Sequence, residues 1–212
     1  GGPVALSGRA GLTRLREFLL VPTAPAFEQP PTVDVQSWVA FQTRLWAPGE
    51  IPADEVEALN TERVAMVRAL KREFGPAFVG GLVPTAFART HYPGDLTPHS
   101  SKYVEYLRLK KQCLVSVYTR GVEHSLAFKL GETFAASQCL VSVPLRYDVP
   151  QPLEDKRHYV VYETIEQCLE ACHALLADRA WAQQMRENNH RYYLDQVEPA
   201  AHLADVLRRC AG

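Results

Sequence analysis

One segment of the sequence carries residues that could bind a phosphate and a diol. Within residues 124–137, Ser125, Lys129 and Glu132 recur at helical spacing, so they share one face of an expected helix. The lysine ammonium can bind a phosphate, and the glutamate carboxylate can accept hydrogen bonds from both hydroxyls of a ribose. Free N–H groups around His124 and Ser125, at the start of this helix, would add an anion site. The pattern suits a nucleoside diphosphate. Its alternative is a solvated Lys–Glu pair at i,i+3.

Two arginines stand where expected strands end. Arg44 follows an apolar run that begins at residue 35, and Arg120 follows the run CLVSVY at 113–118. A guanidinium pairs with phosphate oxygens in a bidentate manner, which favours a role in binding a pyrophosphate. For Arg44 the alternative is an ordinary surface ion pair.

Strand-like and helix-like segments alternate along the chain, and this alternation predicts the fold class. Apolar runs rich in Val, Leu and Ala indicate strands within 35–46, 77–84, 113–118, 138–145 and 158–163. Amphipathic stretches indicate helices over 52–74, 102–112, 124–137, 164–178, 179–197 and 199–210. The sequence therefore predicts an α/β fold, a Rossmann-like parallel sheet with helices on both faces. Such sheets bind ligands at the carboxyl ends of their strands.

A proline-rich stretch, residues 22–31, interrupts regular structure near the start of the chain and suggests three parts. Residues 1–34 are expected to be a linker or the remnant of a preceding domain. Residues 35–180 are expected to form the Rossmann-like domain. Residues 181–212 are expected to form carboxyl-terminal helices that pack on it.

Composition excludes several classes of partner. The formal net charge is −1 and the basic residues are scattered, which disfavours nucleic acid and anionic membranes. No apolar run is long enough to cross a membrane. The five cysteines have no framework spacing, which favours reduced thiols and a cytoplasmic location. Cys168, Cys172 and His173 could suggest a metal site, but core packing is preferred, and no Asp-x-Asp cluster stands ready for a metal.

The segment SLAFKLGETFAASQCLVSVPL resembles the nucleotide-sugar-binding segment of retaining-type GT-B glycosyltransferases, of the group 1 or family 4 kind. The matching positions are Lys129, Glu132, Ala135 and Val141. VAFQTRLW, with Arg44, is similar to the family's first strand and arginine turn, and residues 160–193 are similar to its carboxyl-terminal tail. Departures are His124 where a first glutamate is common, and Ser137 and Gln138 where a glycine is usual.

The resemblance implies the donor-binding half of a glycosyltransferase, with residues 35–180 as the nucleotide-sugar-binding domain. It implies no metal cofactor and a nucleoside diphosphate sugar as substrate. The resemblance implies contacts from Arg44, Lys129 and Glu132, and the residue pattern adds Arg120, His124 and Ser125 as expected contacts. The acceptor-binding half would be a missing amino-terminal domain or a partner subunit. One rival is a non-catalytic interaction module or degenerate subunit that keeps the half-fold. Another is a different doubly wound protein, such as a sugar-phosphate epimerase half or a flavodoxin-like domain.

Overall fold

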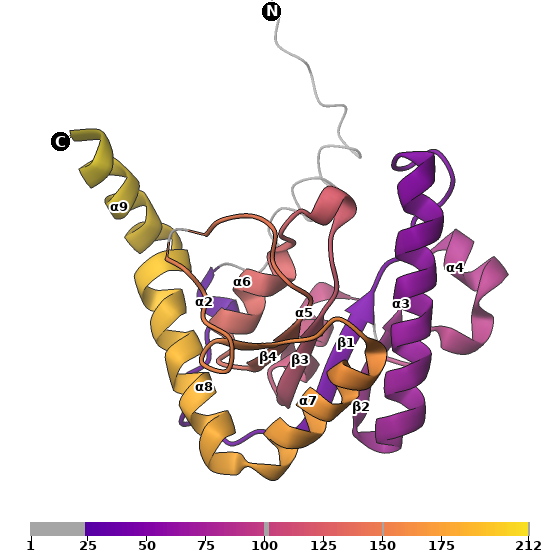
Figure 1. The fold of residues 1–212 in the computed structure, drawn as a ribbon, viewed down its shortest axis with the longest axis horizontal. Coiled ribbons are helices and arrows are strands. Elements are labelled where there is room, and N and C mark those ends of the chain that lie inside the picture. Colours follow the sequence, from indigo (N-terminus) through magenta and orange to yellow (C-terminus); the bar gives the residue numbers. More distant parts are fainter. Residues whose placement is uncertain (1–23, 100–101, 150, 212) are drawn as a thin grey trace, which may run out of the picture.

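The structure, a computed structural model, describes residues 24–99, 102–149 and 151–211, and its centre is a five-stranded sheet. All neighbouring strands are parallel, in the order β2-β1-β3-β4-β5 (Figure 1). The strands are β1 (Gln36–Thr43), β2 (Phe78–Leu82), β3 (Cys113–Tyr118), β4 (Cys139–Ser142) and β5 (Tyr159–Val161). The predicted α/β class with a parallel sheet is confirmed.

Successive residues of each strand point to opposite faces of the sheet, and both faces are covered. On one face, Val39, Phe41 and Val115 join a large apolar core with α3 (Ala53–Phe74) and α7 (Ile165–Ala177). On the other face, Ala40 packs with Leu109 of α5 (Tyr103–Lys110). Burial on both sides explains why these strands read as continuous apolar runs rather than as alternating ones.

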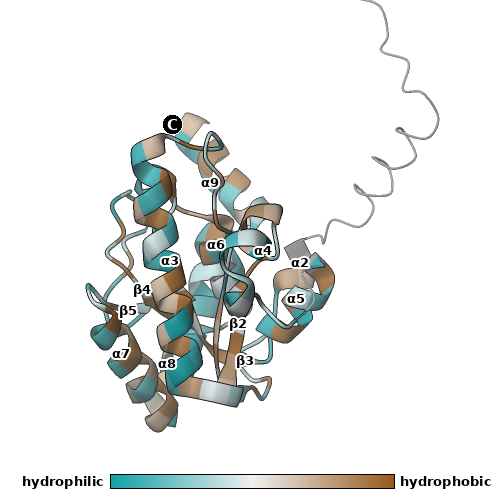
Figure 2. Cartoon of the chain, turned by 90° about the vertical axis from the view of Figure 1, so that its right-hand side faces the viewer, coloured by the Kyte–Doolittle hydropathy of each residue, from teal (hydrophilic) through white to brown (hydrophobic). Residues whose placement is uncertain are grey.

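Two further helices complete the second face. Leu140 of β4 packs with Leu130 and Phe134 of α6 (Phe128–Ala135) and with Tyr192 of α8 (Arg179–Tyr192). Figure 1 shows α3 beside the β1–β2 side of the sheet and α8 at the opposite side, next to α6. Hydrophilic residues mark much of the visible side of α3 and α8 in Figure 2, as expected for helices that bury only one face.

The helix ends follow from local sequence. Pro52 precedes α3, whose first turn holds Asp54 and Glu55 and whose last turn holds Lys71 and Arg72. These charges complement the helix dipole. Thr164 and Gln167 form a reciprocal capping box at the start of α7.

The segments outside the sheet differ in part from expectation. A short helix, α4 (Ala86–His91), lies in a stretch for which no helix was predicted. The described part of the expected linker contains α2 (Ala24–Phe27) and packs on α6, where the Gln29 N–H donates to the Ala135 carbonyl at 2.8 Å. Residues 1–23 of that expected linker or remnant lie outside the described residues.

The carboxyl-terminal region continues beyond α8. A single π-helical turn (Tyr193–Val197) follows α8 and leads into α9 (Pro199–Ala211). None of the described helices is both long and apolar enough to cross a membrane. All five cysteines are free, and Cys168 and Cys172 pack in the core as expected.

Candidate functional site

The strand order creates a switch point between β1 and β3. The chain leaves β1 for β2 on one side and returns to β3 on the other, so the loops after β1 and β3 diverge at the carboxyl edge. A crevice at such a point is where open α/β sheets bind ligands. Arg44 directly follows β1, and Arg120 lies two residues beyond β3, so both predicted arginines stand at this edge.

Arg63 of α3 ties the two diverging loops together. Its guanidinium donates to the carbonyl of Arg44 at 2.8 Å and to the carbonyl of Arg120 at 3.3 Å. The side chain is buried, and burial lowers the pKa of Arg63. Sequence analysis missed Arg63 because an arginine in the middle of an amphipathic helix reads as a solvated residue.

The loop after β1 is anchored to α3 by a second contact. The Asn60 side chain accepts from the Trp46 N–H at 3.0 Å and donates to the Trp46 carbonyl at 2.8 Å. This reciprocal pair holds the Arg44–Trp46 backbone in place. Preorganised backbone of this kind positions side chains for a ligand without further ordering cost.

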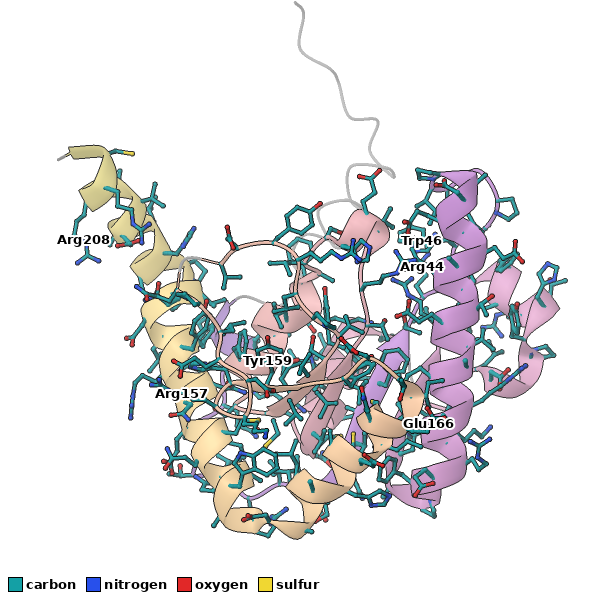
Figure 3. All side chains as sticks on the ribbon, in the orientation of Figure 1. Arg44, Trp46, Arg157, Tyr159, Glu166 and Arg208 are labelled. Atoms are coloured by element: carbon teal, nitrogen blue, oxygen red, sulfur yellow. The ribbon has the colours of Figure 1, made fainter. Side chains whose placement is uncertain are left out.

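Both arginines are engaged with acidic side chains. Arg44 forms an ion pair with Glu50. Its guanidinium also stacks on the Trp46 ring, 4.6 Å from the ring centroid, and Figure 3 labels Arg44 and Trp46 side by side. Arg120 pairs with Glu55 at 2.7 Å and with Glu62 at 3.3 Å. Burial is the main cause of the raised pKa of Glu62, and Arg120 opposes it. The guanidinium groups of Arg44 and Arg120 at this edge are therefore neutralised by carboxylates.

Lys129 reaches the same edge from α6. Its ammonium donates to the carbonyl of Gln42, near the end of β1. The pKa of Lys129 is lowered to about 7, chiefly by burial and further by repulsion from Lys110 and Arg63. A lysine in this state gains a proton when an anion binds beside it.

Glu132 occupies a different place from the one expected. It is only 8% exposed, and its Oε2 lies 3.2 Å from the Nζ of Lys110, which is itself 1% exposed. Glu132 is therefore buried in an ion pair, whereas a carboxylate that accepts hydrogen bonds from a ribose was expected to be open to the ligand. The physical reason is Lys110 at the end of α5, because a buried ammonium requires a counter-charge and Glu132 supplies it.

The segment before α6 also differs from the prediction. The helix begins at Phe128 rather than at 124, because Glu123 and His124 adopt positive φ angles of 51° and 61° in a short turn. The N–H groups of His124 and Ser125 donate to Gly121 and Val122 carbonyls at 3.1 and 2.9 Å. The predicted anion site of free N–H groups at His124 and Ser125 is therefore absent from this part of the described chain.

Gly121 and Tyr118 explain this local geometry. A Cβ at Gly121 would lie 2.4 Å from the Ser125 carbonyl oxygen, so only glycine permits the close turn. The Tyr118 hydroxyl then donates to the Ser125 carbonyl at 3.1 Å and accepts from the Ala127 N–H at 2.9 Å. These contacts keep residues 125–127 out of the helix.

A cavity of about 360 Å³ opens at the carboxyl edge. Arg120 and His124 line it, and Arg146, which was not predicted, adds an exposed cation. The start of α7, at Thr164 and Ile165, faces the same space, and a helix amino terminus favours negative charge. Of the six predicted contacts, only Arg120 and His124 line this cavity.

Unsatisfied polar atoms gather around the switch point. Five buried side-chain nitrogen or oxygen atoms in the described part of the chain have no hydrogen-bond partner. Three of them belong to this region: Trp46 Nε1, Glu62 Oε1 and Arg63 Nε. Buried polar groups are almost always paired, so their concentration marks a place where water or a ligand completes the bonding.

A bound metal ion requires a group of suitable side chains that lie close together. No group of three or more His, Cys, Asp or Glu side chains among the described residues is arranged to hold a metal ion. The chemistry that the edge offers is electrostatic, because the guanidinium groups of Arg120 and Arg146 line the cavity and the Lys129 ammonium lies at the end of β1.

Comparison with known proteins bears on the fold alone. No protein-family model and no curated protein matches the sequence. Among solved structures, the chain is similar to the C-terminal domain of a glycosyl transferase group 1 family protein (LpcC) from Francisella tularensis. The TM-score is 0.55 at 10% identity, and the match covers 84% of this chain and 99% of that one. The chain therefore has the fold of a group 1 glycosyltransferase carboxyl-terminal domain.

Proposed function

We propose that this chain is the donor-binding half of a glycosyltransferase and binds a nucleoside diphosphate sugar at the carboxyl edge of its sheet. The observation that carries the proposal is the switch point itself. Arg120, after β3, lines the cavity at this edge, and Lys129 on α6 reaches the end of β1. Three buried polar atoms of the same region have no partner among the described residues. The fold of a group 1 glycosyltransferase domain supports the assignment.

In this proposal Lys129, Arg44 and Arg120 contact the diphosphate. The lysine supplies a point charge, and the arginines turn from their carboxylates toward phosphate oxygens. His124 and Ser125 lie at the rim, in the turn before α6. Glu132 stays a predicted ribose contact, and that role requires its carboxylate to leave Lys110.

The contribution to catalysis would be stabilisation of the departing diphosphate by these cations. The acceptor needs a second binding surface, which we propose another domain or a partner subunit supplies. Without it, the acceptor is unpositioned and the leaving group stays in water, so the chain alone should bind nucleotide and transfer no sugar.

A second candidate is a non-catalytic interaction module that keeps the half-fold. It is favoured by the ion pairs that already engage Arg44, Arg120 and Glu132. The two candidates differ in whether a nucleotide binds at all.

The test is a thermal-shift and calorimetry panel of UDP, GDP, ADP and CMP with the matching nucleosides. A diphosphate present at 100 times its dissociation constant should add about 2.7 kcal/mol to the free energy of unfolding. Lys129→Ala should weaken diphosphate binding more than nucleoside binding. Lys71→Ala, in the last turn of α3, is the matched control. Absence of binding by every nucleotide would favour the interaction module. Equal affinity of the two variants for a diphosphate would show that Lys129 makes no contact with it.

A further inference from the structure

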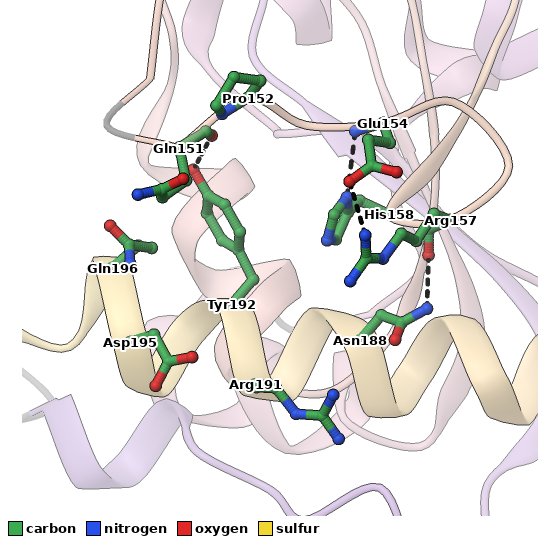
Figure 4. A pocket seen from close by; sticks show the side chains of 10 residues that line it. All are labelled: Gln151, Pro152, Glu154, Arg157, His158, Asn188, Arg191, Tyr192, Asp195 and Gln196. Atoms are coloured by element: carbon green, nitrogen blue, oxygen red, sulfur yellow. Dashed lines mark hydrogen bonds and ion pairs between the residues drawn. The ribbon is translucent and has the colours of Figure 1, made fainter.

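A second cavity lies between the loop 151–158 and α8 (Figure 4). Its volume is about 290 Å³, and it shares no lining residue with the cavity at the carboxyl edge. Its inner wall includes His158, the residue directly before β5. It therefore lies near the amino end of that strand, whereas the proposed nucleotide site lies beyond the carboxyl ends.

The loop that forms one wall is held in place by several hydrogen bonds. The Tyr192 hydroxyl donates to the Gln151 carbonyl at 2.9 Å, and the Asn188 amide donates to the Arg157 carbonyl at 3.3 Å. Within the loop, the His158 N–H donates to the Glu154 carbonyl at 3.0 Å. The cavity is thus preformed, as ligand sites usually are.

His158 presents a hydrogen-bond donor to this cavity. Its Nδ1 accepts from the Glu154 N–H at 3.0 Å, so the neutral ring carries its proton on Nε2. The residue is only 6% exposed, and no hydrogen bond to Nε2 comes from the described residues. In Figure 4 this second nitrogen is turned away from Glu154, toward the interior of the cavity. Burial, with repulsion from Arg157, lowers the pKa of His158 and keeps the ring neutral.

Charges around the cavity balance. Arg157 and Glu154 form an ion pair at 2.6 Å. Arg191 and Asp195 carry opposite charges, and neither forms an ion pair with a described residue. The side-chain amides of Gln151 and Gln196 form no hydrogen bond with a described residue. The cavity therefore offers both donors and acceptors, with no net charge.

We propose that this cavity is a binding site for an uncharged saccharide. A sugar hydroxyl both donates and accepts, so it can use the His158 Nε2–H, the Arg191 guanidinium and the Asp195 carboxylate together. Because two arginines and two acidic side chains surround the cavity, neither an anion nor a cation gains a net electrostatic attraction there. Tyr192 and His158, with ring centroids 5.6 Å apart, supply an aromatic wall for the apolar face of a pyranose.

The size of the cavity sets the length of the saccharide. At about 290 Å³ it lies at the small end of ligand pockets, so a short oligosaccharide or the end of a longer chain fits. This site is independent of the proposed nucleotide site, and either can exist without the other.

The test uses the full chain labelled with 15N-histidine, titrated with maltotriose, cellotriose, mannotriose and N-acetylchitotriose. The His158 Nε2 signal, one of seven histidine side chains, is assigned from its loss in His158→Gln. At least one saccharide should shift this signal saturably, whereas sodium phosphate, calcium chloride and UDP should not. Binding should survive in Lys129→Ala, whatever that variant does to nucleotides.

Variants then assign the shift to the cavity. Arg191→Gln and Asp195→Asn should each weaken the saccharide about tenfold, as expected for loss of a hydrogen bond to a charged group. Arg108→Gln on α5 and Gln184→Ala on the exposed side of α8 are controls that should leave affinity unchanged. The proposal is overturned if no saccharide moves the signal, if phosphate moves it instead, or if both cavity variants bind like the parent.

Discussion

Two lysines, Lys110 at the end of α5 and Lys129 on α6, show how the same side chain takes opposite roles. Lys110 is 1% exposed and lies 3.2 Å from the Glu132 carboxylate, which opposes the effect of burial on its pKa. Lys129 reaches only a backbone carbonyl, and among the described residues its ammonium forms no ion pair. The first lysine is part of the scaffold, whereas the second keeps an unmet need for an anion.

The comparison teaches where to look for the ligand. A buried cation that is paired with a carboxylate is not available to bind a ligand. Removing the carboxylate leaves a buried charge without a counter-charge. Burial lowers the pKa of Lys129 to about 7, so a phosphate that binds beside it stabilises its charged form. Four predictions test this division, from the largest effect to the smallest.

The largest effect on stability concerns the buried ion pair of Lys110 and Glu132. Glu132→Ala should lower the free energy of unfolding by about 3–5 kcal/mol, because it leaves the Lys110 ammonium buried without a counter-charge. Urea unfolding followed by circular dichroism measures it. The double variant Lys110→Met/Glu132→Met is the control and should recover most of the loss, since an apolar pair needs no compensation. A loss below about 1 kcal/mol would show that Lys110 does not depend on Glu132 as its counter-charge.

A medium, pH-dependent effect concerns Lys129. Its pKa of about 7 in the folded state lies below its usual 10.5, so between these values the unfolded chain binds more protons and stability rises with pH. Lys129→Met removes this dependence. Its stability advantage over the parent should be greatest below pH 7 and should shrink as the pH rises above 7. Urea unfolding across that range measures it, and parallel curves for parent and variant would contradict the assignment.

The same lysine predicts proton uptake by the bound state. Above pH 7 the Lys129 side chain of the ligand-free protein is mostly a neutral amine, so diphosphate binding there should be coupled to the uptake of a proton. Titration calorimetry in buffers of different ionisation enthalpy detects this uptake. Lys129→Met should lose the uptake.

The smallest effect concerns the exposed pair at Arg44. Glu50→Gln should change the free energy of unfolding by less than about 1 kcal/mol, because surface ion pairs contribute little. Releasing Arg44 should also raise diphosphate affinity slightly, which titration calorimetry can detect at low salt. A large loss of stability would place Glu50 in the scaffold with Glu132 and not at the ligand edge.

Much of the architecture was predictable from local sequence. The run CLVSVY became β3 within its predicted bounds, and the stretch after Pro52 became α3 with its acidic first turn. The positions of Arg44 and Arg120 after strands placed them at one edge, because parallel strands bring their carboxyl ends together. These features depend on periodicity, capping and strand direction, which neighbouring residues largely decide.

The details of the site depended on contacts between distant segments. The sequence by itself determined that Lys129 and Glu132 share a short helix, yet only the packing of α5 against α6 decided that Glu132 faces Lys110. A lysine near a helix end looks the same in sequence whether water or another helix covers it. Burial makes the difference, because a carboxylate is drawn to the ammonium that has lost its water, and burial is a property of the assembled fold.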